Sequence, residues 1–172
     1  NGKAVAFSGR IYKNTDQNKY LNTKETEIFK KGHMLYHYDI ARNEARLEKS
    51  VIIMEGFMDV IRASTIGIRN TIALMGTALT QDQIHLIKRL SSNIILCLDG
   101  DSPGQEAMLK AGELFLKEKM EVKVMVLPPD DDPDTFILRE GKEKFSRLIE
   151  NAIYFNNYKI RALKRNINLT SD

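Results

Sequence analysis

From residue 51 onward the sequence alternates short, mostly apolar runs with segments of helical periodicity, and this alternation limits the possible folds. The runs lie at 51–54, 71–74, 94–98 and 122–127. A run that is so short and so continuously apolar is typical of a strand buried on both faces. Four such strands separated by helices predict an α/β fold, in which a parallel sheet carries helices on both faces.

Capping residues predict where the helices between these strands begin. Thr80 followed by Gln83 has the pattern of a capping box, in which each residue satisfies a backbone N–H of the other. Ser102 is expected to cap the next helix, with Pro103 at its first position. Both helices would then present one apolar face to the sheet.

The two ends of the chain differ from this middle part. Residues 1–50 predict short antiparallel strands joined by a polar turn, followed by an amphipathic helix at 38–49. Beyond Pro133 the sequence predicts helix from about residue 135 to residue 165, interrupted at Gly141. The expected divisions are therefore a small basic α+β segment at 1–50, the α/β sheet at 51–135 and a helical segment at 136–172.

Composition excludes several classes of protein. The chain has 172 residues, of which 42% are hydrophobic, so it can bury a sizeable core. It contains no apolar run of about 18 residues and no charged start followed by a long apolar segment, so we expect a cytoplasmic protein that does not bind membranes. The single cysteine, Cys97, excludes disulfides and thiolate zinc sites within the chain.

The net charge of +3 conceals an acidic middle between two basic flanks. Residues 1–50 hold ten basic and six acidic residues, 51–135 hold eight and thirteen, and 136–172 hold eight and four. This pattern suits a polyanion that docks on the flanks while cations gather in the middle.

Acidic residues follow three of the predicted strands. Glu55 and, one helical turn later, Asp59 follow the first strand, and Asp99 and Asp101 follow the third. The third acidic group follows the fourth strand and consists of Asp130, Asp131, Asp132 and Asp134. Because ligands bind at the carboxyl ends of parallel strands, we expect these groups to meet at one edge of the sheet.

Carboxylates that meet in this way repel one another unless a cation or a proton removes the repulsion. Oxygen ligands without cysteine or histidine favour Mg²⁺ or Mn²⁺ over zinc. Such sites usually serve phosphates, since Mg²⁺ keeps positions for water and substrate oxygens. Each acidic group alone is more often a turn or a solvated loop, but the three together predict a metal site.

These residues resemble a known signature. Glu55-Gly-Phe-Met-Asp59, together with Asp99-Gly-Asp101, resembles the Toprim signature, which primases, type IA and type II topoisomerases and some recombination and nuclease proteins share. Three further segments are similar to bacterial DnaG-type primases: KYLNTKETEIFKKGHMLY at 19–36, ALMGTALTQDQIHLI at 73–87 and LPPDDDPDTFI at 127–137. The resemblance extends over about residues 3–155.

The resemblance implies the Toprim-containing part of the RNA polymerase region of a primase, an enzyme that makes short RNA primers on single-stranded DNA. Residues 1–50 would belong to the basic amino-terminal subdomain, 51–135 would be the Toprim domain, and 136–172 would begin a helical bundle. The chain would be a fragment, without the zinc-binding module and without the tail that binds the replicative helicase.

The implied reaction is attack of the 3′ hydroxyl of one nucleotide on the α-phosphorus of an incoming ribonucleoside triphosphate, with release of pyrophosphate. Bound Mg²⁺ or Mn²⁺ would polarise the phosphate and stabilise the attacking oxygen. The implied catalytic residues are Glu55, Asp59, Asp99 and Asp101. The implied metal residues are Glu55, Asp99, Asp101, Asp132 and Asp134. The residues implied to contact nucleotide or nucleic-acid phosphates are Arg10, Lys19, Tyr20, Asn22 and Lys31.

Three other interpretations stay open on the sequence. A topoisomerase-like protein shares the acidic signature but needs a tyrosine nucleophile on another domain. A receiver-like module would bind Mg²⁺ at a strand-end aspartate without polymerising nucleotides. A nucleotide-sensing site would hold the polyphosphate of a regulatory nucleotide on the same metals and basic residues, which is compatible with primase activity.

Overall fold

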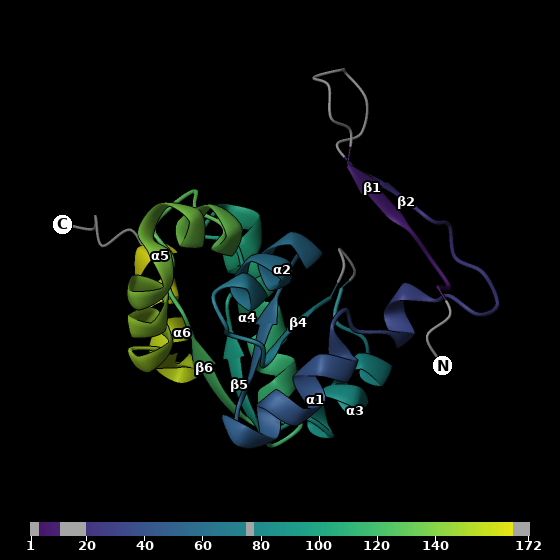
Figure 1. Cartoon of the computed structure of the whole chain (residues 1–172). Helices are drawn as coiled ribbons and strands as arrows, with labels where there is room; N and C mark the ends of the chain where they lie inside the picture. The colour runs from purple at the N-terminus through teal and green to yellow at the C-terminus, as the bar shows by residue number, and fades with distance from the viewer. Residues whose placement is uncertain (1–3, 11–19, 75–77, 167–172) are drawn as a thin grey trace.

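The computed structural model describes residues 4–10, 20–74 and 78–166. Its elements in chain order are β1 (Ser8–Arg10), β2 (Tyr20–Asn22), the 3₁₀ turn η1 (Lys31–His33), α1 (Tyr38–Leu47), β3 (Val51–Met54), α2 (Phe57–Thr65), β4 (Thr71–Ala73), α3 (Gln81–Lys88), β5 (Asn93–Leu96), α4 (Ser102–Lys117), β6 (Glu121–Val124), α5 (Pro133–Glu150), β7 (Ile153–Tyr154) and α6 (Phe155–Asn166). Within these ranges no helix is both long and apolar enough to cross a membrane. Figure 1 shows an α/β body from which the β1–β2 hairpin stands apart.

The α/β body is built on one sheet with the strand order β4-β3-β5-β6-β7. Strands β4, β3, β5 and β6 are parallel, which confirms the predicted four-stranded sheet, and Val51 lies opposite Ile94 where β3 and β5 pair. Strand β7 is antiparallel to β6 and only two residues long, too short to leave a pattern in the sequence. The helical segment predicted from about 135 to 165 is confirmed in its interruption at Gly141, where α5 bends, but it is wrong at 153–154, where β7 separates α5 from α6.

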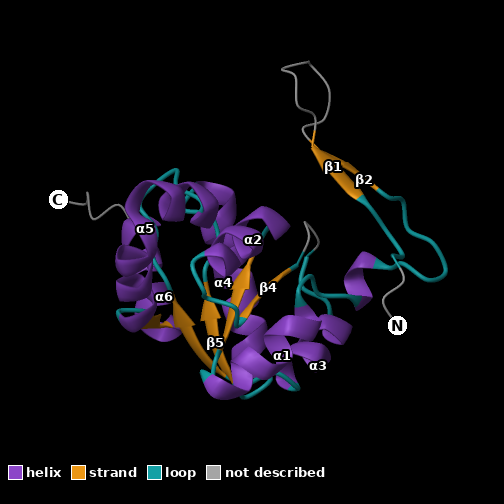
Figure 2. Ribbon diagram, viewed as in Figure 1, coloured by secondary structure: helices purple, strands orange, loops and turns teal. Residues whose placement is uncertain are grey.

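Both faces of the sheet are buried because successive strand residues enter different cores. Val51 and Ile53 pack in one core with residues of α1, α3, α4 and α6. Ile52 and Met54 pack in the other core with residues of α2 and α5. All four side chains have no exposed surface. Figure 2 shows the orange strands enclosed by purple helices, the arrangement that a continuous apolar run predicts.

The helix starts confirm one predicted cap and correct another. Thr80 Oγ1 accepts a hydrogen bond from Gln83 N at 3.2 Å, and Thr80 N donates to Gln83 Oε1 at 3.2 Å, so the predicted capping box is present. The prediction that Ser102 caps α4 is wrong, because the helix already includes that residue and Asp101 is its cap. Asp101 Oδ1 accepts a hydrogen bond from Gly104 N at 2.7 Å. Serine and aspartate cap helices about equally well, so composition alone does not distinguish adjacent candidates.

The amino-terminal segment also has the predicted elements. Strands β1 and β2 pair antiparallel, with Ser8 opposite Asn22 and Arg10 opposite Tyr20. The amphipathic helix predicted at 38–49 is α1. The hairpin therefore brings two of the residues expected to contact phosphates into register with each other.

Candidate metal centre

The carboxyl ends of β3, β5 and β6 lie side by side at one edge of the sheet. Cys97 N donates a hydrogen bond to Ile53 O at 2.9 Å, and Met125 N donates to Leu96 O at 2.9 Å. These bonds hold the three neighbouring chain segments together up to the points where the acidic residues follow. The carboxylates whose charges act on Asp99 at this edge are Glu55, Asp59, Asp101 and Asp132.

Asp99 is the centre of this acidic edge. Its Oδ1 atom is buried and has no hydrogen-bond partner among the described residues. Burial, reinforced by the four neighbouring carboxylates, raises the pKa of Asp99 to about 7. A buried oxygen without a partner is unfavourable, and so is a buried negative charge among others. A cation bound at Asp99 would remove both costs.

Asp59 and Glu55 are also perturbed by burial. Asp59 is 6% exposed, and its two oxygens accept hydrogen bonds from Gly56 N at 3.0 Å and from Asp134 N at 3.3 Å. Burial raises the pKa of Asp59 to about 6, although these two hydrogen bonds favour the charged form. Burial and then the charge of Asp101 raise the pKa of Glu55. Because both oxygens of Asp59 already accept backbone hydrogen bonds, its position suits a residue that supports the site.

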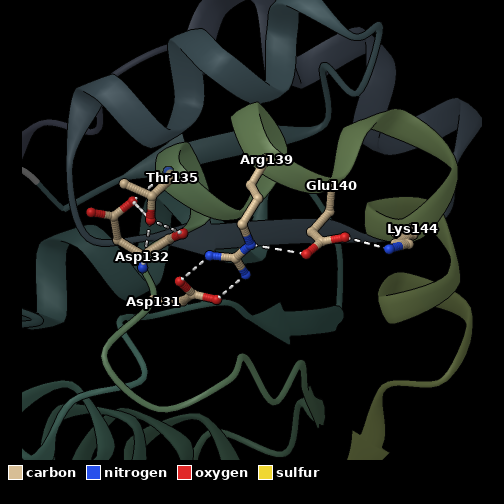
Figure 3. Close-up of polar contacts among 6 residues, drawn as sticks. All are labelled: Asp131, Asp132, Thr135, Arg139, Glu140 and Lys144. Carbon is tan, nitrogen blue, oxygen red and sulfur yellow. Dashed lines mark hydrogen bonds and ion pairs between the residues drawn. The ribbon is translucent and has the colours of Figure 1, made fainter.

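Asp101 and Asp132 each cap a helix with one oxygen. Asp132 Oδ1, at the start of α5, accepts hydrogen bonds from Thr135 N at 2.6 Å and Thr135 Oγ1 at 2.8 Å (Figure 3). Asp101 Oδ1 does the same for α4 through Gly104 N. The peptide dipoles at a helix start favour the charged carboxylate. The Oδ2 atom of each aspartate makes no hydrogen bond within the described ranges, which leaves one oxygen per residue available to a cation.

Arginines neutralise two other members of the third acidic group. Arg62 Nε lies 2.5 Å from Asp134 Oδ1, and the two terminal nitrogens of Arg139 lie 2.7 and 2.6 Å from the two oxygens of Asp131 (Figure 3). Both carboxylate oxygens of Asp131 therefore accept hydrogen bonds from Arg139. The metal role of Asp134 stays a prediction. Asp130 is exposed and has a left-handed backbone, with φ of 63°. Neither ion pair could be predicted from the sequence, because each arginine pairs with an acidic residue that lies outside its own helical turn.

The residues present fit a hydrated cation better than an ion enclosed by protein. In the part of the chain that the structure describes, no three or more His, Cys, Asp or Glu side chains are arranged to hold a metal ion by themselves. Mg²⁺ usually takes only one or two protein carboxylates and fills its other positions with water and substrate phosphates. Asp99 has a partnerless buried oxygen, and the charges of Asp101 and Asp132 act on this residue, which matches that requirement.

The residues expected to contact phosphates lie in the amino-terminal segment. Asn22 is exposed at the end of β2, where its Oδ1 accepts a hydrogen bond from Ser8 Oγ at 2.5 Å across the hairpin. Lys31 begins η1, is half-buried, and its backbone N donates to Glu25 Oε1 at 3.0 Å. Lys19 lies outside the described residues, as do the side chains of Arg10 and Tyr20, whose backbones form β1 and β2.

Comparison with known proteins places this geometry in a family. A family model described as Toprim-like matches residues 52–137, and a model of the DNA primase catalytic core, N-terminal domain, matches residues 1–42. The DNA primase of Listeria monocytogenes is 42% identical over 173 residues, which covers 99% of this chain and 28% of that protein. The chain therefore spans a little over a quarter of the length of the curated relatives it matches.

Solved structures agree with these matches. The Aquifex aeolicus primase, a structure of its zinc-binding and RNA polymerase domains, is 35% identical, with a TM-score of 0.85 over 96% of this chain and 41% of that chain. A DnaG primase catalytic domain bound to single-stranded DNA is 35% identical, with a TM-score of 0.85 over 99% of this chain and 54% of that chain. The chain belongs to the Toprim-like family, and over almost its whole length it is similar to bacterial DnaG-type primases.

Proposed function

We propose that this chain is the Toprim-containing part of a primase catalytic core, which synthesises RNA primers on single-stranded DNA during replication. The observation that carries the proposal is the partnerless buried oxygen of Asp99 at the edge where three strands deliver their carboxylates. The relatives reported above are primases, which favours this function over the topoisomerase-like and receiver-like interpretations. The proposed domains are 1–50, 51–135 and 136–172, as expected from the sequence.

The proposed reaction joins two nucleotides. The 3′ oxygen forms a bond to the α-phosphorus of a ribonucleoside triphosphate, the bond to the β-phosphate oxygen breaks, pyrophosphate leaves, and the 3′ hydroxyl loses its proton. When bound, Mg²⁺ or Mn²⁺ supplies charge stabilisation for the attacking and leaving oxygens. More than one ion is proposed, because Asp99 and Asp101 on one loop and Asp132 on another offer carboxylate oxygens.

Each acidic residue of the centre has a proposed role in this reaction. Asp99 and Asp101 hold the cation, with Asp101 fixed in direction by the start of α4. Glu55, whose pKa burial raises, holds a metal or accepts the proton of the 3′ hydroxyl. Asp59 joins the start of α2 to that of α5 and so keeps the carboxylates in place. Asp132 and Asp134, at the start of α5, would complete a second or third ion site.

The template and nucleotide phosphates are proposed to bind the basic amino-terminal segment. Basic side chains bind a phosphate backbone with strong dependence on salt and little dependence on sequence, and an aromatic ring can stack on a base. The residues proposed for this role are Arg10, Lys19, Tyr20, Asn22 and Lys31. The similar catalytic domain bound to single-stranded DNA supports a DNA partner.

Further partners follow from the same chemistry. Ribonucleoside triphosphates would bring their phosphates to the metals, and regulatory polyphosphate nucleotides would compete with them there. A replicative helicase would bind through parts of the longer relatives that this chain does not span. All of these partners would be met in the cytoplasm.

The test is primer synthesis on single-stranded DNA with labelled ribonucleoside triphosphates and Mn²⁺. We expect short products from the parent chain and none from Asp99→Asn, which removes one charged ligand and keeps the side-chain shape. Glu106→Gln is the matched control, because this carboxylate on α4 is 73% exposed and, among the described residues, pairs only with Lys110 at 3.8 Å. Parental yield from a folded Asp99→Asn variant would contradict the assignment. If even the parent makes no product, loss of Mn²⁺ binding in Asp99→Asn tests the same site.

A further inference from the structure

Arg139, on α5, clamps the acidic loop that precedes this helix. Its two terminal nitrogens form a bidentate pair with Asp131, whose side chain is only 14% exposed beneath it. Its Nε donates to Glu140 Oε1 at 2.9 Å, and Glu140 in turn pairs with Lys144 (Figure 3). The guanidinium carbon also lies 5.7 Å from the centre of the Phe136 ring. The guanidinium is thus held in one orientation, the condition under which a bidentate arginine fixes its partner.

Asp131, the partner of Arg139, connects two acidic loops through backbone hydrogen bonds: its own loop, 128–132, and the turn that contains Gly100. Asp131 O accepts a hydrogen bond from Gly100 N at 2.8 Å, and Asp131 N donates to Pro128 O at 3.2 Å. The approach is so close that a Cβ atom on Gly100 would lie 2.3 Å from Pro128 O. Loop 128–132 therefore rests directly on the turn that contains Gly100.

The contact between loop 128–132 and the turn at Gly100 determines the relative positions of the candidate metal ligands on the two loops. Gly100 lies between Asp99 and Asp101, and Asp131 immediately precedes Asp132. Moving the backbone of Asp131 would change the position of Asp132 relative to Asp99, because the hydrogen bond from Gly100 N to Asp131 O joins the two loops at this point. Both carboxylate oxygens of Asp131 accept hydrogen bonds from Arg139, so Asp131 contributes to the metal centre through the position of its backbone.

We propose that Arg139 is a positioning residue for the metal centre, acting through Asp131 and Gly100 on the separation of the two ligand loops. The inference rests on the proposed function, because it concerns the same metal centre. Groups that orient a metal ligand without touching the metal commonly change affinity by about 10- to 100-fold when they are removed. An arginine two helical turns from the loop would thus control a site that it does not enter.

The experiment measures Mn²⁺ affinity of the whole chain by the electron paramagnetic resonance signal of free Mn²⁺, with circular dichroism to confirm folding. We expect Arg139→Gln to weaken Mn²⁺ binding by about tenfold. The Mn²⁺ affinity of Arg139→Lys should lie between those of the parent chain and Arg139→Gln, since lysine keeps the charge but not the bidentate geometry. Lys144→Gln is the matched control, because it shortens the same charged network at its far end, and should bind Mn²⁺ like the parent.

A second variant separates positioning from direct metal contact. Asp131→Asn breaks the pair from the other side, and the double variant with Arg139→Gln should be no weaker than either single variant, because both remove one interaction. Unchanged Mn²⁺ affinity in folded Arg139→Gln would overturn the inference, and so would a loss confined to Asp131→Asn, which would make that residue a ligand. If Asp99→Asn also leaves Mn²⁺ affinity unchanged, the metal centre itself is wrong, and the inference falls with it.

Discussion

Asp99→Asn should stabilise the metal-free chain at alkaline pH, although it should abolish metal binding. The pKa of Asp99 is raised from 3.8 to about 7, so the folded chain holds this proton more tightly than the unfolded chain does. Stability is therefore lost as the pH rises from about 4 through 7, and the loss is complete above the folded pKa. Each pKa unit corresponds to about 1.4 kcal/mol, which sets a ceiling of about 4 kcal/mol.

The expected effect is smaller than this ceiling because Asp99 is partly exposed and water screens its neighbours. We expect Asp99→Asn to raise the free energy of unfolding by about 1–2 kcal/mol at pH 8 and to have almost no effect near pH 4. For a chain of this size, 1 kcal/mol corresponds to about 2–4 °C in Tm. Comparing the two chains at each pH cancels the titration of all other groups.

The assay is thermal and urea unfolding with EDTA at pH 4, 6 and 8, followed by the same series with Mn²⁺. Mn²⁺ should stabilise the parent and not Asp99→Asn, since ligand binding to the folded state alone adds to its stability. Glu106→Gln should follow the parent in both series. If Asp99→Asn instead loses stability equally at all three pH values, the Asp99 carboxylate is a net stabilising group, and the electrostatic reasoning fails.

Two further predictions concern the scaffold of the centre. Arg62→Met should lower the free energy of unfolding by about 1–2 kcal/mol at neutral pH, because it leaves Asp134 unpaired among other acids, and adding Asp134→Asn should restore much of the loss in urea unfolding. If the double variant does not recover stability, the loss of the Arg62–Asp134 pair is not the cause of the destabilisation. Gly112→Ala should lower Tm, since its Cβ would lie 2.1 Å from Cε2 of the buried Phe155 ring, and overpacking costs about 1–3 kcal/mol. Gly9→Ala is the control, as its Cβ would meet no atom of the described residues closer than 4.0 Å, and equal melting shifts in both variants would refute the clash.

The sheet and its acidic edge could be predicted because their causes are local in the sequence. Val51 to Met54 are all buried, so the run is continuously apolar, and Glu55 follows at the first exposed position. The same logic applies to β5 and Asp99. Parallel pairing then brings the strand ends together without any knowledge of side-chain contacts.

The contacts that orient the carboxylates could not be predicted in the same way. Arg62 and Asp134 are 72 residues apart, and their pairing depends on how α2 and α5 pack. The pairing of Arg139 with Asp131 depends on loop 128–132 folding back along α5. Surface arginines are common, so neither residue differs in sequence from a solvated one.

The acidic residues of the centre differ in how their charge is compensated, and this difference indicates where a cation binds. Helix starts stabilise the charges of Asp101 and Asp132, and an arginine neutralises Asp131. Asp59 receives two backbone hydrogen bonds. Asp99 alone among these five combines a raised pKa with an oxygen that lacks any partner within the described residues. Burial and the neighbouring negative charges at Asp99 are therefore unfavourable interactions that a divalent cation bound there would relieve.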